Sequence, residues 1–431
     1  MKKLFLALVV VCSLFCPMFA IDMSNEIDAA AKNVLPQVIE WRRFIHQHPE
    51  LSNREFETSK LVAEKLKEFG LEVRTGIAHT GVVGILKGGK PGPVVGIRAD
   101  MDALPVTERV DVPFKSTVIG EYNGQKVGVM HACGHDSHVA MLLGTAKVLS
   151  GMRAQVPGTV VFVFQPAEEG APAGEEGGAS LMVKEGAMDN PKIEAMFGLH
   201  INSHMEIGKI GWKSEGFMAA ADILTIKIHG KQSHGAYPWN GVDPIAVATQ
   251  IYTGLQMIVS RESELPRSPV VITIGRIQGG VRNNIIPAEL VMEGTIRTLD
   301  MDVQKSVHDK IRLTATKIAE SMGATVDVTI KKQTPITYNT PALVEKMLPS
   351  LQKAAGPGNL VQMQWVTGAE DFAFYREKAP AFFFNLGGMP AGHDPASAPD
   401  HHTPDFYIDD SKLDVGVKAF CNMVFDYAAA K

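Results

Sequence analysis

The chain has 431 residues, more than one hydrophobic core usually organises, so we expect two domains. Hydrophobic residues make up 45% of the chain, which is enough for two ordinary interiors. Charged residues make up 21% and the formal net charge is -5, so no basic field would attract nucleic-acid phosphates. These values argue against a nucleic-acid partner and favour a small-molecule ligand.

The N-terminus predicts a secretory signal. Lys2 and Lys3 precede an apolar run over residues 4–15, and the segment ends at the small residue Ala20. This layout is typical of a cleavable signal peptide at residues 1–20, so we expect a periplasmic or secreted mature protein. An uncleaved anchor is the alternative. Because no later run is apolar for ~20 residues, we expect no stable membrane insertion.

Runs of branched and aromatic residues predict buried strands, and stretches with apolar residues at helical spacing predict helices. The strands fall at residues 94–97, 160–164, 195–199 and 381–384, and the helices at residues 61–69, 140–149 and 306–322. This alternation predicts an α/β fold with a mostly parallel sheet.

A different pattern begins near Trp212. Segments that alternate like strands surround a helix-compatible stretch, and a further helix is predicted to begin near Asp302. The strand-like segments are residues 222–228, 270–274 and 290–296, and the helix-compatible stretch is residues 244–260. This order predicts a smaller α+β domain inserted into the first, with the chain returning to the main sheet around residues 329–340.

Polar side chains follow three of the predicted strands. Asp100 and Asp102 come after the first, Glu168 and Glu169 after the second, and His200 after the third. In open α/β sheets, ligands bind beyond the carboxyl ends of the strands. We therefore expect these acids and this imidazole to lie in one region.

The segment MHACGHDSH, residues 130–138, concentrates three histidines, a cysteine and an aspartate. Cys133 and His135 flank a glycine, which lets the backbone curl so that both side chains face one metal site. His131 and His138 fit capping or core roles better. The spacing therefore indicates Cys133 and His135 as metal ligands.

The cysteines bear on the same site. Cys12 and Cys16 lie in the predicted signal, which leaves Cys133 and Cys421. Exported proteins usually pair such thiols, but within a His/Asp cluster a thiolate is a better metal ligand than a disulfide partner. We expect the cluster to lower the thiol pKa of Cys133, and Cys421 to be a buried apolar residue.

The segment FQPAEEG sets Glu168 and Glu169 on a turn after an apolar strand. One of two adjacent carboxylates can bind metal ions, while the other stays unligated. The unligated one can accept a proton from water whose pKa a metal has lowered toward ~7. Two solvated surface glutamates are the alternative, which the preceding apolar strand weakens.

Further histidines could complete a metal centre. His200 ends the run AMFGLH, and His401 and His402 lie in the Pro-rich loop PDHHTPDF. With the cysteine, the histidine and a glutamate already described, they supply the ligands that two ions need. In RADMDALP, Asp100 and Asp102 suit acceptance of the free N–H of a ligating histidine, with turn capping as the alternative.

Motifs of this kind follow one another along almost the whole mature chain. In order they are RRFIHQHPELSNREFET from Arg42, RADMDALP from Arg98, MHACGHDSH from Met130, FQPAEEG from Phe164, GLH at Gly198, GKQSHGAYPWNGVDP from Gly230, NNIIPAELVMEGTIRT from Asn283, GAEDF from Gly368 and HTP at His402. The sequence thereby resembles the hippurate hydrolase and N-acyl-L-amino-acid amidohydrolase family. That family includes plant hydrolases of auxin–amino-acid conjugates and related carboxypeptidases.

The resemblance implies roles for the polar residues of the site. It makes Glu168 the general base and assigns the metal ligands, with His402 chosen over His401 because the family ligand directly precedes a small residue and proline. The implied ligands are Cys133, His135, Glu169, His200 and His402. They would hold two divalent ions per subunit, zinc or manganese, with cobalt or nickel as further candidates.

The resemblance also implies an inserted lid that carries a dimer contact. The lid would span residues 213–328, and the catalytic domain would comprise residues 21–212 and 329–431. His234, Asn284 and Arg297 match positions that approach the substrate. Because His234 is far along the chain from every implied ligand, we expect it to act at the metal site of the partner subunit in a homodimer.

The implied activity is metal-dependent hydrolysis of the amide bond of hippurate-like or N-acetyl amino acids. A metallo-carboxypeptidase or dipeptidase would use the same chemistry, although a cysteine ligand favours the acylase branch by resemblance. A non-catalytic metal-binding or ligand-binding protein would have no reason to keep Glu168 unligated. A thiol hydrolase with Cys133 as nucleophile would need no metal.

Overall fold

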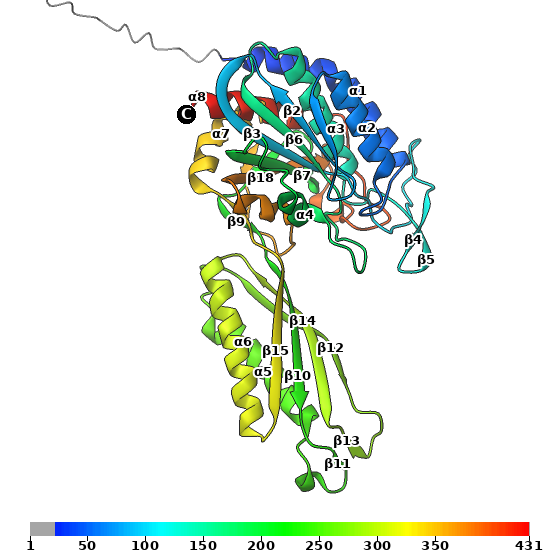
Figure 1. Ribbon diagram of the computed structural model, residues 1–431, viewed down its shortest axis with the longest axis vertical. Helices are drawn as coiled ribbons and strands as arrows, with labels where there is room; N and C mark the ends of the chain where they lie inside the picture. The colour runs from blue at the N-terminus through cyan, green and yellow to red at the C-terminus, as the bar shows by residue number, and fades with distance from the viewer. Residues whose placement is uncertain (1–21, 431) are drawn as a thin grey trace, which may run out of the picture.

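The computed structural model describes residues 22–430, which form two lobes joined by a narrow connection (Figure 1). The predicted signal at residues 1–20, with Cys12 and Cys16, lies outside the described residues. Within the described part, no helix combines the length and apolar character that crossing a membrane requires.

The larger lobe contains the main sheet. Within residues 22–430 this sheet has eight strands, in the order β1-β2-β6-β3-β7-β18-β8-β17. The central strands β6, β3, β7 and β18 are parallel to one another. Their bounds are Glu72–Ile77 (β1), Gly81–Lys87 (β2), Pro157–Gln165 (β6), Lys90–Asp100 (β3), Ala195–Glu206 (β7), Ala381–Met389 (β18), Ile210–Trp212 (β8) and Leu360–Gln362 (β17). The central strands are almost continuously apolar because helices cover both faces of the sheet.

One face of this sheet packs against α1, α2, α3, α7 and α8, and the other packs against α4 and the 3-10 helix η2. The bounds are Ser24–Gln47 (α1), Phe56–Glu68 (α2), His135–Gly151 (α3), Pro341–Ala355 (α7), Asp414–Ala429 (α8), Gly178–Lys184 (α4) and Asp371–Glu377 (η2). A hairpin of Ile119–Tyr122 (β4) and Gln125–Gly128 (β5) projects from this lobe (Figure 1).

The smaller lobe has an antiparallel sheet in the order β12-β14-β10-β15, covered on one face by α5 and α6. The bounds are Val270–Gly279 (β12), Glu289–Thr298 (β14), Ala221–His229 (β10), Thr325–Thr334 (β15), Pro244–Glu262 (α5) and Met301–Ser321 (α6). Both helices begin at an aspartate, Asp243 or Asp300, whose carboxylate accepts backbone N–H groups of the first turn. Ser233–His234 (β11) pairs with Ile285–Ile286 (β13) at the far end of the lobe (Figure 1).

The predicted α/β class, with a mostly parallel main sheet and a smaller α+β insertion, is confirmed. The predicted strands lie within longer strands, and the predicted helices coincide with helices, although those predicted over residues 61–69 and 306–322 extend one residue past the ends of α2 and α6. The boundary drawn at residue 328 falls inside β15, which stays in the smaller sheet to Thr334. The chain then joins the larger lobe through Thr337–Asn339 (β16), which pairs with Glu215–Met218 (β9). The boundary was misplaced because residues of β15 near it are mostly exposed, so hydrophobic pattern does not mark them.

Candidate active site

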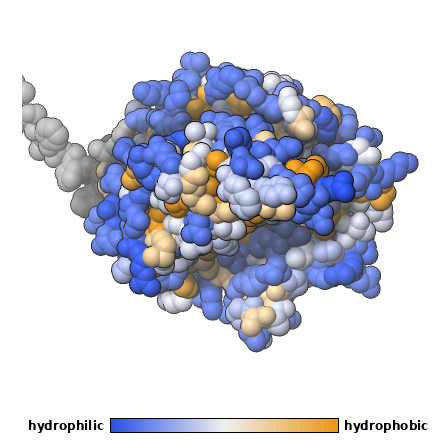
Figure 2. All heavy atoms as spheres, turned by 90° about the horizontal axis from the view of Figure 1, so that it is seen from below, coloured by the Kyte–Doolittle hydropathy of each residue, from blue (hydrophilic) through white to orange (hydrophobic). Residues whose placement is uncertain are grey.

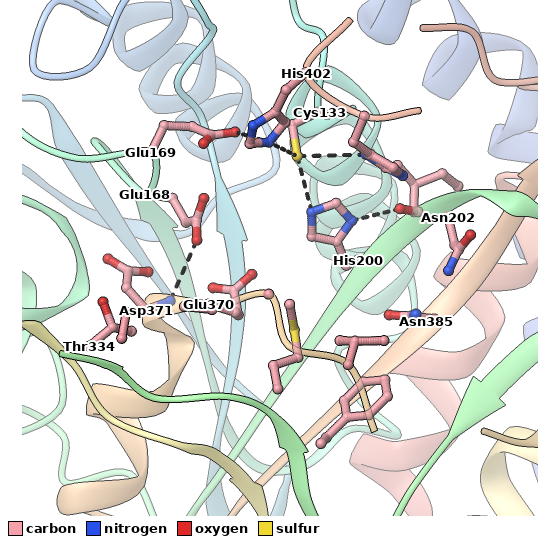
Figure 3. A pocket seen from close by; sticks show the side chains of 18 of the residues that line it. Cys133, Glu168, Glu169, His200, Asn202, Thr334, Glu370, Asp371, Asn385 and His402 are labelled. Carbon is pink, nitrogen blue, oxygen red and sulfur yellow. Dashed lines mark hydrogen bonds and ion pairs between the residues drawn. The ribbon is translucent and has the colours of Figure 1, made fainter. Parts of the chain in front are cut away.

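The candidate site lies at the carboxyl ends of β3 and β6 and beside the middle of β7, because β7 continues past His200 and does not end before it as predicted (Figure 3). A cavity of about 510 Å³ lies there between the two lobes. Side chains of the larger lobe that line it include Cys133, Glu168, Glu169, His200, Asn202, Glu370, Asp371, Asn385, His401 and His402, and those from the base of the smaller lobe include Ala221, Arg297, Gln333 and Thr334.

Gly134 explains how Cys133 and His135 come to serve the same cavity. It precedes α3 with a φ of 90°, in the left-handed region that favours glycine. A Cβ atom there would lie 2.3 Å from Cγ2 of Ile201, so no larger residue fits. This turn sets the Cys133 Sγ atom 3.3 Å from Nε2 of His200.

The remaining predicted ligands gather around these atoms. Nε2 of His402 lies 3.3 Å from Sγ of Cys133 and 3.1 Å from Oε1 of Glu169. Nε2 of His135 lies 3.9 Å from Oε2 of Glu168 and 4.0 Å from Oε1 of Glu169. The structure thus brings all five predicted ligands, and the predicted base, into one place.

The donor atoms fit a pair of divalent ions. Nε2 of His135 and Oε1 of Glu169 are buried, and no hydrogen bond from the described residues reaches either atom. Nδ1 of His135 lies 2.8 Å from the carbonyl oxygen of Asp102, so Nε2 is the ring nitrogen that can face an ion. Although burial opposes it, the charges of Asp100 and Asp102 raise the pKa of this ring to about 10, so a metal ion would displace a proton from Nε2. Cys133 and Cys421 are free thiols in the described part of the chain, as expected. Thiolate, imidazole and carboxylate are donors that zinc and related ions prefer.

The two aspartates of RADMDALP have different contacts. Asp102 faces His135, with its carbonyl oxygen at 2.8 Å and its Oδ1 at 3.3 Å from Nδ1, which is the contact expected for it. Oδ1 of Asp100 instead accepts a hydrogen bond from Nδ1 of His138 at 2.5 Å. His138 in turn accepts the backbone N–H of Ile201, so it is a buried structural residue. Asp100 lies 3.7 Å from Nε2 of His135, the ring nitrogen that can face an ion.

The adjacent histidines His401 and His402 are distinguished by their partners. Nε2 of His401 accepts the backbone N–H of Ser203 at 3.2 Å, so its proton is on Nδ1, which faces Sγ of Cys133 at 3.7 Å. A protonated ring nitrogen cannot bind a metal ion. No backbone N–H of the described residues donates to Nε2 of His402, which faces Cys133 and Glu169, so the geometry favours His402 as the ligand.

The pKa of the Cys133 thiol differs from the one that the sequence led us to expect. Burial and the charges of Glu169 and Glu168 raise its pKa well above the usual range, whereas the sequence led us to expect a lowered pKa. Burial also lowers the pKa of the neighbouring His200, and of His401 to about 3, so these two rings supply no positive charge that would lower the thiol pKa. A divalent cation beside the sulfur would lower this pKa and hold Cys133 as a thiolate.

A buried charged network lies behind Glu168. Arg98 is 1% exposed and donates to Asp100, Gln165, Glu370 and Asp371 at 2.6 to 3.0 Å. Burial and the charges of Glu370, Glu169 and Asp371 raise the pKa of Glu168 well above its usual range. A cation beside Glu168 would reverse this shift and leave the carboxylate ready to accept a proton.

Sequence reasoning assigned no role to Glu370 and Asp371. The backbone N–H of Asp371 lies 3.5 Å from Oε1 of Glu168, and both acids line the cavity (Figure 3). The GAEDF motif was the available signal, because it sets two adjacent acids directly before an apolar residue. Asn202 and Asn385 also line the cavity, and no sequence motif pointed to them.

The three lid residues divide between two places. Arg297, on β14, lines the cavity from the smaller lobe. His234 and Asn284 lie instead at β11 and β13, at the end of this lobe away from the larger one (Figure 1), and among the described residues they do not line the cavity. The backbone N–H of Gly235 donates to the carbonyl oxygen of Asn284 at 2.8 Å, so His234 and Asn284 are neighbours.

A cavity with these donors and a free carboxylate defines a two-metal hydrolase, and known proteins agree. Residues 96–426 match the model of Peptidase family M20/M25/M40. Thermostable carboxypeptidase 2 of Saccharolobus solfataricus is 38% identical, over 94% of this chain and 99% of that protein. IAA-amino acid hydrolase ILR1-like 2 of Arabidopsis thaliana is 36% identical, over 92% and 87%. N-acetylcysteine deacetylase of Bacillus subtilis is 37% identical, over 90% and 96%.

Solved structures lead to the same class. The Bacillus subtilis YXEP protein, a dinuclear metal binding peptidase from the M20 family, matches with a TM-score of 0.77 and 35% identity, over 93% of this chain and all of that one. A protein from methicillin resistant Staphylococcus aureus matches with a TM-score of 0.86 and 32% identity, over 94% of this chain and 100% of that one. The chain belongs to Peptidase family M20/M25/M40 and is a metal-dependent hydrolase of the amidohydrolase and peptidase type.

Proposed function

We propose that the protein hydrolyses the amide bond of N-acyl-L-amino acids. The observation that carries the proposal is the cavity, in which Glu168 stands beside the ligand cluster while Arg297 faces it from the other lobe. Relatives named IAA-amino acid hydrolase and N-acetylcysteine deacetylase support the substrate class, since both names describe an acyl group removed from an amino acid.

Five residues would hold two divalent ions, zinc or manganese, with cobalt or nickel as alternatives: Cys133, His135, Glu169, His200 and His402. Such ions act as Lewis acids toward the amide carbonyl and lower the pKa of water toward ~7. Glu168 accepts a proton from the attacking water and passes it to the amide nitrogen as the C–N bond breaks. The products are a carboxylate and a free amino acid.

Arg297 is suited to bind the carboxylate of the amino-acid half. Its guanidinium makes no hydrogen bond or ion pair with another side chain in the described part of the chain, although it borders the cavity. A planar guanidinium binds a carboxylate through two parallel hydrogen bonds. A substrate fixed in this way would present its amide bond to Glu168.

His234 and Asn284 would complete the site of a partner subunit in a homodimer. Both lie on the end of the smaller lobe, where the rings of Tyr237 and Trp239 are 53% and 73% exposed. Figure 2, which looks onto this end, shows orange and pale residues gathered among blue ones. Apolar side chains left exposed around two polar residues of this kind suit a contact with another chain.

The predicted signal at residues 1–20 supports a periplasmic or secreted location for this activity. Secretion of a reporter fused to these residues, compared with a fusion in which Lys2 and Lys3 are replaced by Glu, tests the location. Retention of the first reporter in the cytoplasm would reject it.

A metallo-carboxypeptidase activity is the second candidate, because the relative that is 38% identical carries that name. The deciding experiment measures kcat/KM of metal-reconstituted protein on acetyl, benzoyl and indole-acetyl amino acids, with dipeptides as comparison. We expect the acylated amino acids to be preferred. Preference for the dipeptides would replace the proposed function by the peptidase one.

A further inference from the structure

The turn that carries Glu168 has an unfavourable backbone conformation. Ala167, directly before it, has a φ of 52°, in the left-handed region that disfavours residues with a Cβ atom. Asn53, just before α2, has a φ of 59°. Such conformations persist where surrounding contacts hold them, and they cluster at functional sites.

Both of these residues donate their backbone N–H to the same oxygen atom. Oε1 of Glu55 lies 2.9 Å from the nitrogen of Ala167 and 3.0 Å from that of Asn53. Oε2 of Glu55 lies 2.5 Å from the hydroxyl oxygen of Thr80, within hydrogen-bond distance. Because Glu55 is 0% exposed, water has no access to replace these contacts.

The next two amides of the turn bind a second acid. Oδ1 of Asp102 lies 3.1 Å from the nitrogen of Glu168, and Oδ2 lies 3.0 Å from that of Glu169. Three successive N–H groups are therefore held by two buried side chains from separate segments. Asp102 also contacts His135, whereas Glu55 reaches the turn through the main chain of Ala167 alone.

We propose that Glu55 is a positioning residue for hydrolysis, which holds the backbone of Ala167 so that Glu168 is directed into the cavity. This inference rests on the proposed role of Glu168 as general base. Misplacement of a reacting group by about 1 Å costs on the order of 10²-fold in rate. Because Asp102 still holds the amide of Glu169, loss of the Glu55 contact should change turnover and leave metal content unchanged.

Glutamine is a close substitute in this position. Burial and the charge of Asp102 raise the pKa of Glu55 to about 8, so the side chain carries a proton at pH 7. A neutral carboxylic acid offers one oxygen as acceptor for the two N–H groups, as an amide does. Glu55→Gln therefore preserves the contact with Ala167, with its NH₂ group facing the hydroxyl of Thr80.

Glu50 provides a matched control. Its carboxylate also accepts two backbone N–H groups, those of Glu57 at 3.0 Å and Thr58 at 2.8 Å, but these belong to α2. We expect Glu55→Met to lower kcat on the order of 10- to 100-fold, with KM and bound zinc unchanged. Glu50→Met and Glu55→Gln should keep kcat within about threefold of the parent, whatever their melting temperatures.

A second readout needs no turnover. Hydrogen exchange of the peptide spanning residues 165–170, measured in metal-free full-length protein, should be faster in Glu55→Met and unchanged in Glu50→Met. If Glu55→Met and Glu50→Met have equal kcat and equal exchange, Glu55 does not position Glu168 and the inference is overturned. If Glu55→Met fails to fold, Thr80→Val, which frees Oε2, should lower kcat severalfold, and an unchanged kcat overturns the inference equally.

Glu168→Gln is measured beside these variants. If Glu168→Gln is inactive while Glu55→Met and Glu50→Met have equal kcat and equal exchange, only the positioning role of Glu55 is rejected. A fully active Glu168→Gln would reject the general-base role, and with it the proposed mechanism.

Discussion

Oε1 of Glu169 lies 3.1 Å from Nε2 of His402, although the two residues come from distant parts of the chain. Within residues 22–430, Oε1 of Glu169 has no hydrogen-bond partner, and Nε2 of His402 has only the sulfur of Cys133. A contact between an acid and an imidazole that both face a thiol is the arrangement of ligands that share metal ions.

Glu168 and Glu169 should fail in different ways. Glu168→Gln is expected to keep its metal and lose about 10²- to 10⁴-fold in kcat, because it removes the proton acceptor. Glu169→Gln is expected to lose metal, because it removes a ligand. Metal analysis by mass spectrometry and kcat measured on the same samples test both. Loss of metal in Glu168→Gln, with retention in Glu169→Gln, would exchange the two roles.

Zinc binding should release a proton from Cys133. The raised pKa of the thiol keeps it protonated in metal-free protein at pH 7.5, and a metal ligand must be a thiolate. Calorimetric zinc titrations in two buffers of different ionisation enthalpy give the number of protons released. Cys133→Ala should release about one fewer. The same number in both proteins would show that Cys133 is not a ligand.

His131 should make stability fall as the pH falls. Burial lowers its pKa from 6.5 to about 3, so between these values the unfolded chain binds a proton that the folded chain does not. The free energy of unfolding then decreases by about 1.4 kcal/mol for each unit below pH 6.5. His131→Leu should flatten this dependence in urea denaturation of metal-free protein at pH 7 and pH 5. If the free energy of unfolding changes with pH equally in both proteins, a lowered pKa of His131 is not the cause of the pH dependence.

Arg297→Met should weaken binding of substrates that have a free carboxylate. We expect KM for an N-acyl amino acid to rise on the order of 10- to 100-fold, because a hydrogen bond to a charged group contributes about 1.5 to 3 kcal/mol. The α-amide of the same substrate is the control, since it carries no negative charge. A rise of the same size for the amide would mean that Arg297 does not bind the carboxylate.

His234 should act in the partner's site. Subunits with Glu168→Gln and subunits with His234→Ala are each expected to be inactive, and mixing them should restore part of the activity. A mixed dimer then has one composite site in which both residues are intact. Absence of recovery after verified subunit exchange would exclude action in the partner's site. Full activity of His234→Ala alone would exclude a catalytic role.

Local patterns were sufficient to predict the main helices and strands and to single out part of the cluster, whereas the division of roles between Glu168 and Glu169 and the choice of His402 came from the family resemblance. Cys133 and His135 flank a single glycine, Gly134, and Glu168 and Glu169 come shortly after the apolar strand β6. Short segments of sequence were therefore enough to single out these four residues. The pKa of Cys133 was not predictable in this way. It depends on which neighbours are charged, and burial decided that His200 would be neutral.

Contacts between a side chain and a distant main chain were also beyond the sequence. Glu55 accepts the backbone N–H of Ala167 from a distant segment of the chain. Because nearly every residue type has a backbone N–H, the identity of residue 167 does not reveal this contact. The position of His234 could be predicted as remote from the ligands, but not as the end of a lobe. The boundary inside β15 was missed because an exposed strand carries little hydrophobic signal.

The cavity has one wall on each lobe, and the chain passes between the lobes only beside β9 and β16 in the described part. The distance from Arg297 to Glu168 is therefore set by the angle between two bodies and not by either core. A substrate that contacts both walls would couple its own binding to that angle. A molecule too short to contact both walls would gain no such coupling, so the length of the substrate would itself be a criterion of selection.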